Sequence, residues 1–284
     1  MNMKPLVVTL AALTVVFATQ HEIKADAISI SDGSTSFSWN AETGSASLVS
    51  TLGGTVSIPS FEPMVRYTNF WSSTATRGAQ TYSQSSGVRT VFVNNSASNS
   101  GNVGVMTVNY GYRNGLSSAV NELTATYTFA VSTTDLGGKV DYSLKLQNNA
   151  GKTLSNVSLF NYWDMDLASA DSGSWLTLPD GTTGIVQEGG TKRVVHSPLD
   201  GGSWEVAALS AGLENDIATG GNLSNSGAPF GPGDMTAAFG NSLGSMSSGS
   251  SQTFDYSLQS IPEPSSAFVI TLACVAVGAI RRRR

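Results

Sequence analysis

Hydrophobic and polar residues alternate with a period of two along the body of this chain, and no stretch longer than two turns has the period of a helix. The alternation is clearest at 103–110, 123–131 and 140–146. Because successive side chains of a strand point to opposite faces of its sheet, this pattern predicts strands that bury one face. Further strands are predicted at 35–39, 46–51, 88–93, 154–167, 184–186, 192–196, 204–209, 235–239 and 252–258.

Polar turns separate these runs, as at Asp135-Leu136-Gly137-Gly138 and Asp200-Gly201-Gly202. About a dozen short strands with such turns predict an all-β fold, an antiparallel β-sandwich in which each sheet buries one face. No linker or internal repeat interrupts residues 28–260, so we expect one domain there. The Gly-, Ser- and Asn-rich segments 72–87 and 212–233 are predicted to be long surface loops.

The first 27 residues have the pattern of a secretory signal peptide. Lys4 supplies the positive charge, Leu6 to Ala18 form the apolar stretch, and Ala25-Asp26-Ala27 provides an A-x-A cleavage site. We predict cleavage after Ala27, with cleavage after Ala18 as the alternative. The remainder of the chain is therefore expected to be exported.

The last 24 residues, 261–284, combine three pieces in a fixed order. Pro262 and Pro264 flank Glu263 and should keep that tripeptide extended and accessible. The uncharged run 267–280 predicts a transmembrane helix of about 21 Å, short of the roughly 30 Å hydrocarbon core. A basic block follows, consisting of Arg281, Arg282, Arg283 and Arg284. By the positive-inside rule this block stays cytoplasmic, which places everything before Pro262 outside the inner membrane.

This order of proline-framed tripeptide, apolar run and arginine block resembles the PEP-CTERM sorting signal of Gram-negative bacterial exoproteins. The resemblance covers the 24-residue tail. It implies that an exosortase, a membrane-embedded transpeptidase-like enzyme, cuts near Pro262-Glu263-Pro264. The chain would then be a substrate of the exosortase and of signal peptidase, and not itself an enzyme. It would reside transiently in the inner membrane and finally at the cell surface or in the extracellular matrix, where exopolysaccharide is a further expected partner.

Composition narrows the function classes of the exported part. Residues 28–264 carry 18 acidic and nine basic side chains, a net charge of −9, which argues against nucleic acid as a partner. The single cysteine, Cys274, lies in the apolar tail. The body therefore has no disulfide, no thiolate metal site and no cysteine nucleophile.

The strongest candidate for a metal-binding or catalytic site is the run Tyr162-Trp163-Asp164-Met165-Asp166. On a strand, Tyr162, Asp164 and Asp166 share one face, with the two carboxylates about 7 Å apart. The first interpretation is a strand end whose aspartates cap neighbouring turns. The second is a Ca²⁺ site completed by Asp171 and nearby carbonyl groups. The third is a glycosidase acid–base pair formed by Asp164 and Asp166.

His196 is a weaker candidate for a catalytic residue, and two aromatic residues are weaker candidates for ligand binding. His196 is the one histidine left after signal removal, its neighbours suggest a strand edge, and no G-x-S-x-G motif accompanies it. We therefore predict no catalytic residue. Trp71 and Tyr162 are the candidate aromatic contacts for a sugar ligand.

Three hypotheses for the body follow from these candidates. The first is a structural or adhesive component of the envelope or exopolysaccharide layer. The second is a carbohydrate-binding module. The third is a polysaccharide-active enzyme that uses Asp164 and Asp166.

Overall fold

The computed structural model describes residues 27–41, 43–67, 70–73, 81–84, 87–113, 120–167, 171–177, 181–218 and 221–262. Within these ranges, only the backbone is described at 70–73, 81–84, 87–95, 112–113 and 262. The predicted signal peptide up to Asp26, including Ala25, and the tail from Glu263 to Arg284 lie outside the described residues. Within the described ranges, we find no helix with the length and apolar character needed to cross a membrane.

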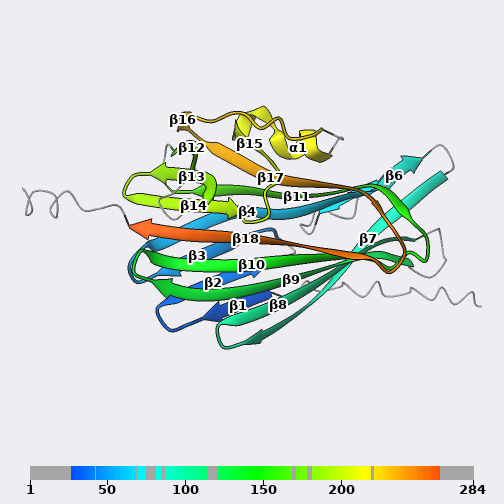
Figure 1. The fold of residues 1–284 in the computed structure, drawn as a ribbon, viewed down its shortest axis with the longest axis horizontal. Coiled ribbons are helices and arrows are strands. Elements are labelled where there is room, and N and C mark those ends of the chain that lie inside the picture. Colours follow the sequence, from blue (N-terminus) through cyan, green and yellow to red (C-terminus); the bar gives the residue numbers. More distant parts are fainter. Residues whose placement is uncertain are drawn as a thin grey trace, which may run out of the picture.

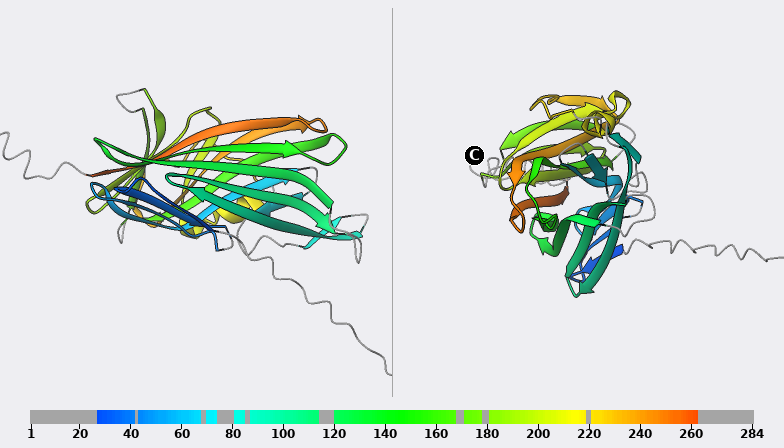
Figure 2. Two further views of the ribbon diagram at one scale, coloured as in Figure 1. Left: turned by 90° about the horizontal axis from the view of Figure 1, so that it is seen from below. Right: turned by 90° about the vertical axis from the view of Figure 1, so that its right-hand side faces the viewer.

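Two antiparallel sheets pack face to face (Figures 1 and 2), which confirms the prediction of an all-β fold. The first sheet has eight strands in the order β1-β2-β3-β4-β11-β17-β15, with β5 pairing to β4. Its strands are β1 (Ala27–Ser31), β2 (Thr35–Asn40), β3 (Ala46–Ser50), β4 (Gly54–Tyr67), β5 (Phe70–Ser73), β11 (Leu154–Asp166), β15 (Ser203–Ala208) and β17 (Met235–Met246).

The second sheet has ten strands in the order β16-β12-β13-β14-β18-β10-β9-β8-β7-β6. Its strands are β6 (Thr81–Gln84), β7 (Gly87–Ser100), β8 (Val103–Arg113), β9 (Val120–Thr134), β10 (Gly137–Asn148), β12 (Asp171–Thr177), β13 (Thr183–Gly189), β14 (Lys192–Pro198), β16 (Phe230–Gly233) and β18 (Ser251–Pro262). The long runs of period-two alternation in the sequence correspond to β8, β9 and β10, which are neighbours in this sheet.

Aromatic side chains from both sheets fill the space between them. Phe37 of the first sheet lies 5.1 Å from Phe129 of the second, measured between ring centroids. Phe61 meets Tyr142 edge to face at 5.7 Å. Burying one such ring stabilises the fold by about 1.5–3 kcal/mol. The described residues include no cysteine, so this core stabilises the fold without disulfides.

A second, smaller core covers the outer face of the first sheet. The short helix α1 (Leu213–Ala218) packs Leu213 and Ile217 against Phe160 and Tyr162 of β11. Figure 1 shows α1 beside β15 and β17. The prediction that 212–233 is only a surface loop is therefore wrong. Leu213 and Ile217 are four residues apart, which places them on one side of the helix and buries both.

Strand β18 occupies a central position in the second sheet, between β10 and β14. It pairs with ten residues of β10 and with seven of β14. Its last two residues, Ile261 and Pro262, lie opposite Arg193 and Lys192. Pro262 is thus extended, as expected, but it is paired with Lys192 and not free of the sheet, so the proline-framed motif begins within the sheet itself.

Candidate functional site

The candidate site lies at the C-terminal end of β11, which is an interior strand of the first sheet. This strand lies between β4 and β17 in the first sheet. Trp163 and Met165 face the core between the two sheets, whereas Phe160 and Tyr162 face the α1 side. The predicted alternation of faces along β11 is therefore confirmed. Asp164 follows Tyr162 on the α1 side.

The antiparallel register of β11 and β17 brings a third carboxylate to Asp164 and Asp166. Asp164 lies opposite Thr236, so continuing the register by two residues sets Asp166 opposite Asp234. Asp234 is the single residue between β16 and β17. Each of the three aspartates offers one carboxylate oxygen, and these oxygens all lie within 4.8 Å of one another.

The three aspartates differ in their surroundings. Asp166 and Asp234 are exposed, whereas Asp164 is only 9% exposed. The Oδ1 atom of Asp164 is buried and has no hydrogen-bond partner among the described residues. Burial, followed by the charges of Asp166, Asp234 and Asp171, raises the pKa of the Asp164 carboxyl to about 6. Asp164 therefore holds a negative charge at neutral pH in surroundings that oppose it.

Asp171, the third acid predicted from the sequence, has a different role. It begins β12, is 3% exposed, and accepts a hydrogen bond from Nε2 of Gln187 at 2.9 Å. The same Gln187 nitrogen donates to the carbonyl oxygen of Met165 at 2.6 Å. Asp171 thus ties β12 to the end of β11 through Gln187, and it is not one of the three aspartates that share the 4.8 Å cluster.

His196 is a core histidine, and the prediction that it lies at a strand edge is wrong. Its strand β14 pairs with β13 on one side and β18 on the other. The imidazole is 1% exposed, and its Nε2 lies 2.7 Å from the hydroxyl of Tyr142. Burial lowers the pKa of His196 to about 3, so the ring is neutral. A buried neutral imidazole paired with a tyrosine is not arranged as the base of a serine hydrolase.

Of the two candidate aromatics, the structure describes the side chain of Tyr162 alone. Tyr162 is 3% exposed and packs under α1, so its ring offers no open face. Trp71 lies in β5, opposite Arg66, and its side chain is outside the described residues. A pair that the sequence did not single out is Trp175 and Trp204, which stack at 4.6 Å with 3° between their planes. Both are partly buried against the core and join β12 to β15 across the two sheets.

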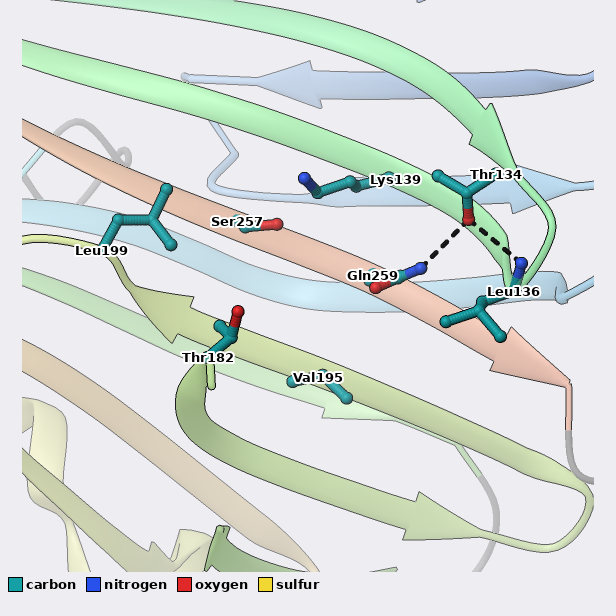
Figure 3. A pocket seen from close by; sticks show the side chains of 8 residues that line it. All are labelled: Thr134, Leu136, Lys139, Thr182, Val195, Leu199, Ser257 and Gln259. Atoms are coloured by element: carbon teal, nitrogen blue, oxygen red, sulfur yellow. Dashed lines mark hydrogen bonds between the residues drawn. The ribbon is translucent and has the colours of Figure 1, made fainter. Parts of the chain in front are cut away.

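A groove of about 240 Å³ lies on the second sheet, over β10, β14 and β18. Leu136 and Leu199 stand at its opposite ends, with Ser257 and Gln259 between them (Figure 3). Nε2 of Gln259 donates to the Thr134 hydroxyl at 3.1 Å. None of the three clustered aspartates lines this groove.

Comparison with models of known protein families gave no match, and a search of the curated proteins gave none either. The chemistry of the site is therefore argued from its geometry. Three convergent carboxylate oxygens suit a hard divalent cation such as Ca²⁺. Asp234, the third member of the cluster, was not identified from the sequence, because only the register between β11 and β17 brings it to Asp164 and Asp166.

Proposed function

We propose that this chain is an exported surface protein, delivered by a PEP-CTERM-like tail, whose β-sandwich body serves as a structural or adhesive component. The observation that supports the proposal is a single folded β body between the two predicted processing sites. Its first strand in the chain is β1 (Ala27–Ser31) and its last is β18 (Ser251–Pro262). The predicted processing sites would therefore leave this body intact.

The composition of the body supports the same proposal. The strands from β1 to β18 contain no cysteine, so the folded unit does not depend on the redox state of its destination. The histidine at position 196 is buried and neutral. A surface or matrix protein needs a stable fold, and the aromatic core between the two sheets supports such a fold.

The position of Pro262 adds a detail to the proposed processing. Because Pro262 is still opposite Lys192 in the sheet, an exosortase would cut directly at the edge of the folded body. In this proposal the run 267–280 holds the tail in the inner membrane, and Arg281 to Arg284 remain in the cytoplasm. After cleavage, the body leaves the membrane and the tail stays behind.

Intact-mass measurement on protein released from the cell surface tests this proposal. The natural chain should begin at Ile28 and lack residues 267–284. Replacing Glu263 with Ala, or both Pro262 and Pro264 with Ala, should leave full-length protein in the inner membrane. Replacing Glu188 with Ala, an acidic residue within the body, should leave processing unchanged. A surface form that still carries Ala267 to Arg284 would refute the proposal.

Carbohydrate binding is the second candidate function, and the groove of Figure 3 favours it. Its lining offers hydroxyl, amide and ammonium groups from Ser257, Gln259 and Lys139, which can hydrogen bond to a saccharide. A glycan array should then show binding that Gln259→Ala weakens. A polysaccharide-active enzyme is the third candidate; hydrolysis that Asp164→Asn abolishes would support it.

A further inference from the structure

We propose that Asp164, Asp166 and Asp234 together bind a calcium ion at the end of β11, where it meets the residue that precedes β17. The proposal concerns the body alone and does not depend on how the tail is processed. Two observations carry it: the convergence of three carboxylates, and the buried, unpartnered oxygen of one of them.

The spacing of the carboxylates suits calcium. Calcium binds protein oxygens at about 2.3–2.6 Å, so two ligands on opposite sides of one ion are about 4.6–5.2 Å apart. The three oxygens here lie within 4.8 Å of one another, so a single ion can contact all three. Magnesium binds at about 2.0–2.1 Å, demands octahedral geometry and releases its waters reluctantly, so it fits a three-carboxylate site at a strand end less well.

The buried oxygen points to a ligand independently of the cluster. Oδ1 of Asp164 is shielded from water and accepts no hydrogen bond from the described residues. Buried acceptors in native proteins are satisfied by a donor, by ordered water or by an ion. If the aspartates only capped turns at the strand end, this oxygen should accept from a backbone amide. The carboxyl group of Asp164 instead has two further acceptors beside it, Asp166 and Asp234, and a cation would satisfy the three carboxylates together.

The ion would join segments that are far apart in the sequence. Asp164 and Asp166 end β11, whereas Asp234 links β16 of the second sheet to β17 of the first. A bound calcium would therefore fasten the two sheets together at this end of the molecule. The exposed carboxylates of Asp166 and Asp234 leave the remaining coordination positions to water or carbonyl oxygens.

The test is calcium binding by the full chain, purified in a mild detergent because of its apolar tail and stripped of metal with a chelator. Titration calorimetry with CaCl2 should give one site with a dissociation constant of about 10⁻⁴ to 10⁻³ M, the range of extracellular calcium modules. Because an ion that binds only the native state stabilises it, about 10 mM CaCl2 should raise the melting temperature by at least about 2 °C. The same concentration of MgCl2 at equal ionic strength should raise it less.

Four variants make the test specific. Asp166→Asn and Asp234→Asn change exposed side chains by one atom each, and either should weaken calcium binding at least about tenfold. Asp135→Asn, in the turn between β9 and β10, removes the same charge elsewhere and should keep the natural affinity. Asp171→Asn should weaken binding less than either of the first two variants, because Asp171 lies near Asp164 but is outside the cluster.

Several results would overturn the proposal. These are the absence of any calcium-dependent shift in the natural chain, an equal shift with MgCl2, or an equal loss of affinity in Asp135→Asn. Loss of binding in Asp171→Asn together with retention in Asp234→Asn would overturn the assignment of Asp234 as a ligand.

Discussion

The imidazole of His196 lies in the space between the two sheets, where it contacts aromatic rings. The ring centroid of Trp163 is 4.1 Å away and that of Phe239 is 5.0 Å away. Tyr142 and Tyr256 complete these surroundings, and none of the four rings carries a charge at acidic pH. These four rings therefore bring no negative charge to His196 that would offset the burial of an imidazolium.

This burial should make folding stability depend on pH. The pKa of His196 is lowered to about 3 in the folded chain, against 6.5 for a free imidazole. Between these values the unfolded chain binds a proton that the native chain does not, so stability falls as the pH drops from about 6.5 toward 3. The slope from this group is at most about 1.4 kcal/mol per pH unit.

Replacing His196 with Gln should remove that slope, because glutamine does not titrate but can still hydrogen bond to Tyr142. The free energy of unfolding, measured by denaturant titration from pH 7 to pH 4, should fall by about 2–3 kcal/mol less in the variant than in the natural chain. Tyr142→Phe serves as the control, since it removes the hydrogen bond and keeps the imidazole. Equal slopes in the natural chain and His196→Gln would contradict the prediction.

Replacing Asp164 should stabilise the fold when no calcium is bound. Its charge is buried beside Asp166 and Asp234, so in the presence of chelator it destabilises the fold at pH 7. Asp164→Asn should therefore increase the free energy of unfolding by on the order of 1 kcal/mol in chelator, and should abolish any gain from calcium. Thermal unfolding with and without CaCl2 measures both effects. A variant that is less stable in chelator would favour a turn-capping role for this carboxylate.

The sequence was informative about these residues only where the relevant neighbours are close along the chain. Asp164 and Asp166 could be placed on one face because they are two residues apart on a strand. Asp234 could not be added, because its approach depends on the register between β11 and β17. His196 was placed at a strand edge because Pro198 follows it closely, yet β18 pairs with β14 as far as Pro198.

At the scale of single elements, the edge of the first sheet at β15 is covered by the chain that follows α1. The backbone nitrogen of Val206 donates to the carbonyl of Ser226 at 3.1 Å, and the nitrogen of Asn225 donates to the carbonyl of Trp204 at 2.8 Å. Gly227 permits this approach with a φ of +94°, where a Cβ would collide with the carbonyl oxygen of Val206. An uncovered edge strand is prone to pair with another chain.

Gly227→Ala should therefore open this edge. We expect the free energy of unfolding to fall by at least about 2 kcal/mol, together with concentration-dependent association seen by size-exclusion chromatography. Gly249→Ala is the matched control: Gly249 has a φ of +75° but nothing within 4 Å of an added Cβ. It should lose only about 1 kcal/mol and remain as monodisperse as the natural chain. Equal behaviour of the two variants would show that Gly227 does not protect the edge.

The elements that sequence analysis identified and missed differ in their periodicity. The predicted strands at 103–110, 123–131 and 140–146 correspond to β8, β9 and β10, whose burial alternates along most of their length. β4 was missed because residues 61–65 are buried on both faces, which leaves no alternation to read. α1 was missed because six residues are too few to show a helical period.

At the scale of the whole molecule, the second sheet depends on β18. This strand supplies Tyr256 and Leu258 to the main core and fills the position between β10 and β14. Its partners are residues 138–147 and 192–198. Without β18 the second sheet would be divided into two parts, each with an open edge.

Ending the chain before Ser251 should consequently abolish cooperative folding, whereas ending it after Pro262 should preserve it. Far-UV circular dichroism and thermal melting compare the two truncations. The longer one, which contains no cysteine, should melt at the same temperature with and without reductant. A cooperative transition in the shorter chain would contradict the central role of β18.

The late arrival of β18 also has a kinetic consequence. Strands β10 and β14 are synthesised before β18, so the edges that β18 will join remain unpaired until residues 251–262 have been made. Partly folded intermediates with unpaired strand edges fold slowly and tend to associate with one another. In this chain β18, which pairs with both edges, is followed directly by Glu263 and Pro264. Completion of the domain and delivery of the proposed cutting site would then be one event, so unfinished chains would be kept from release.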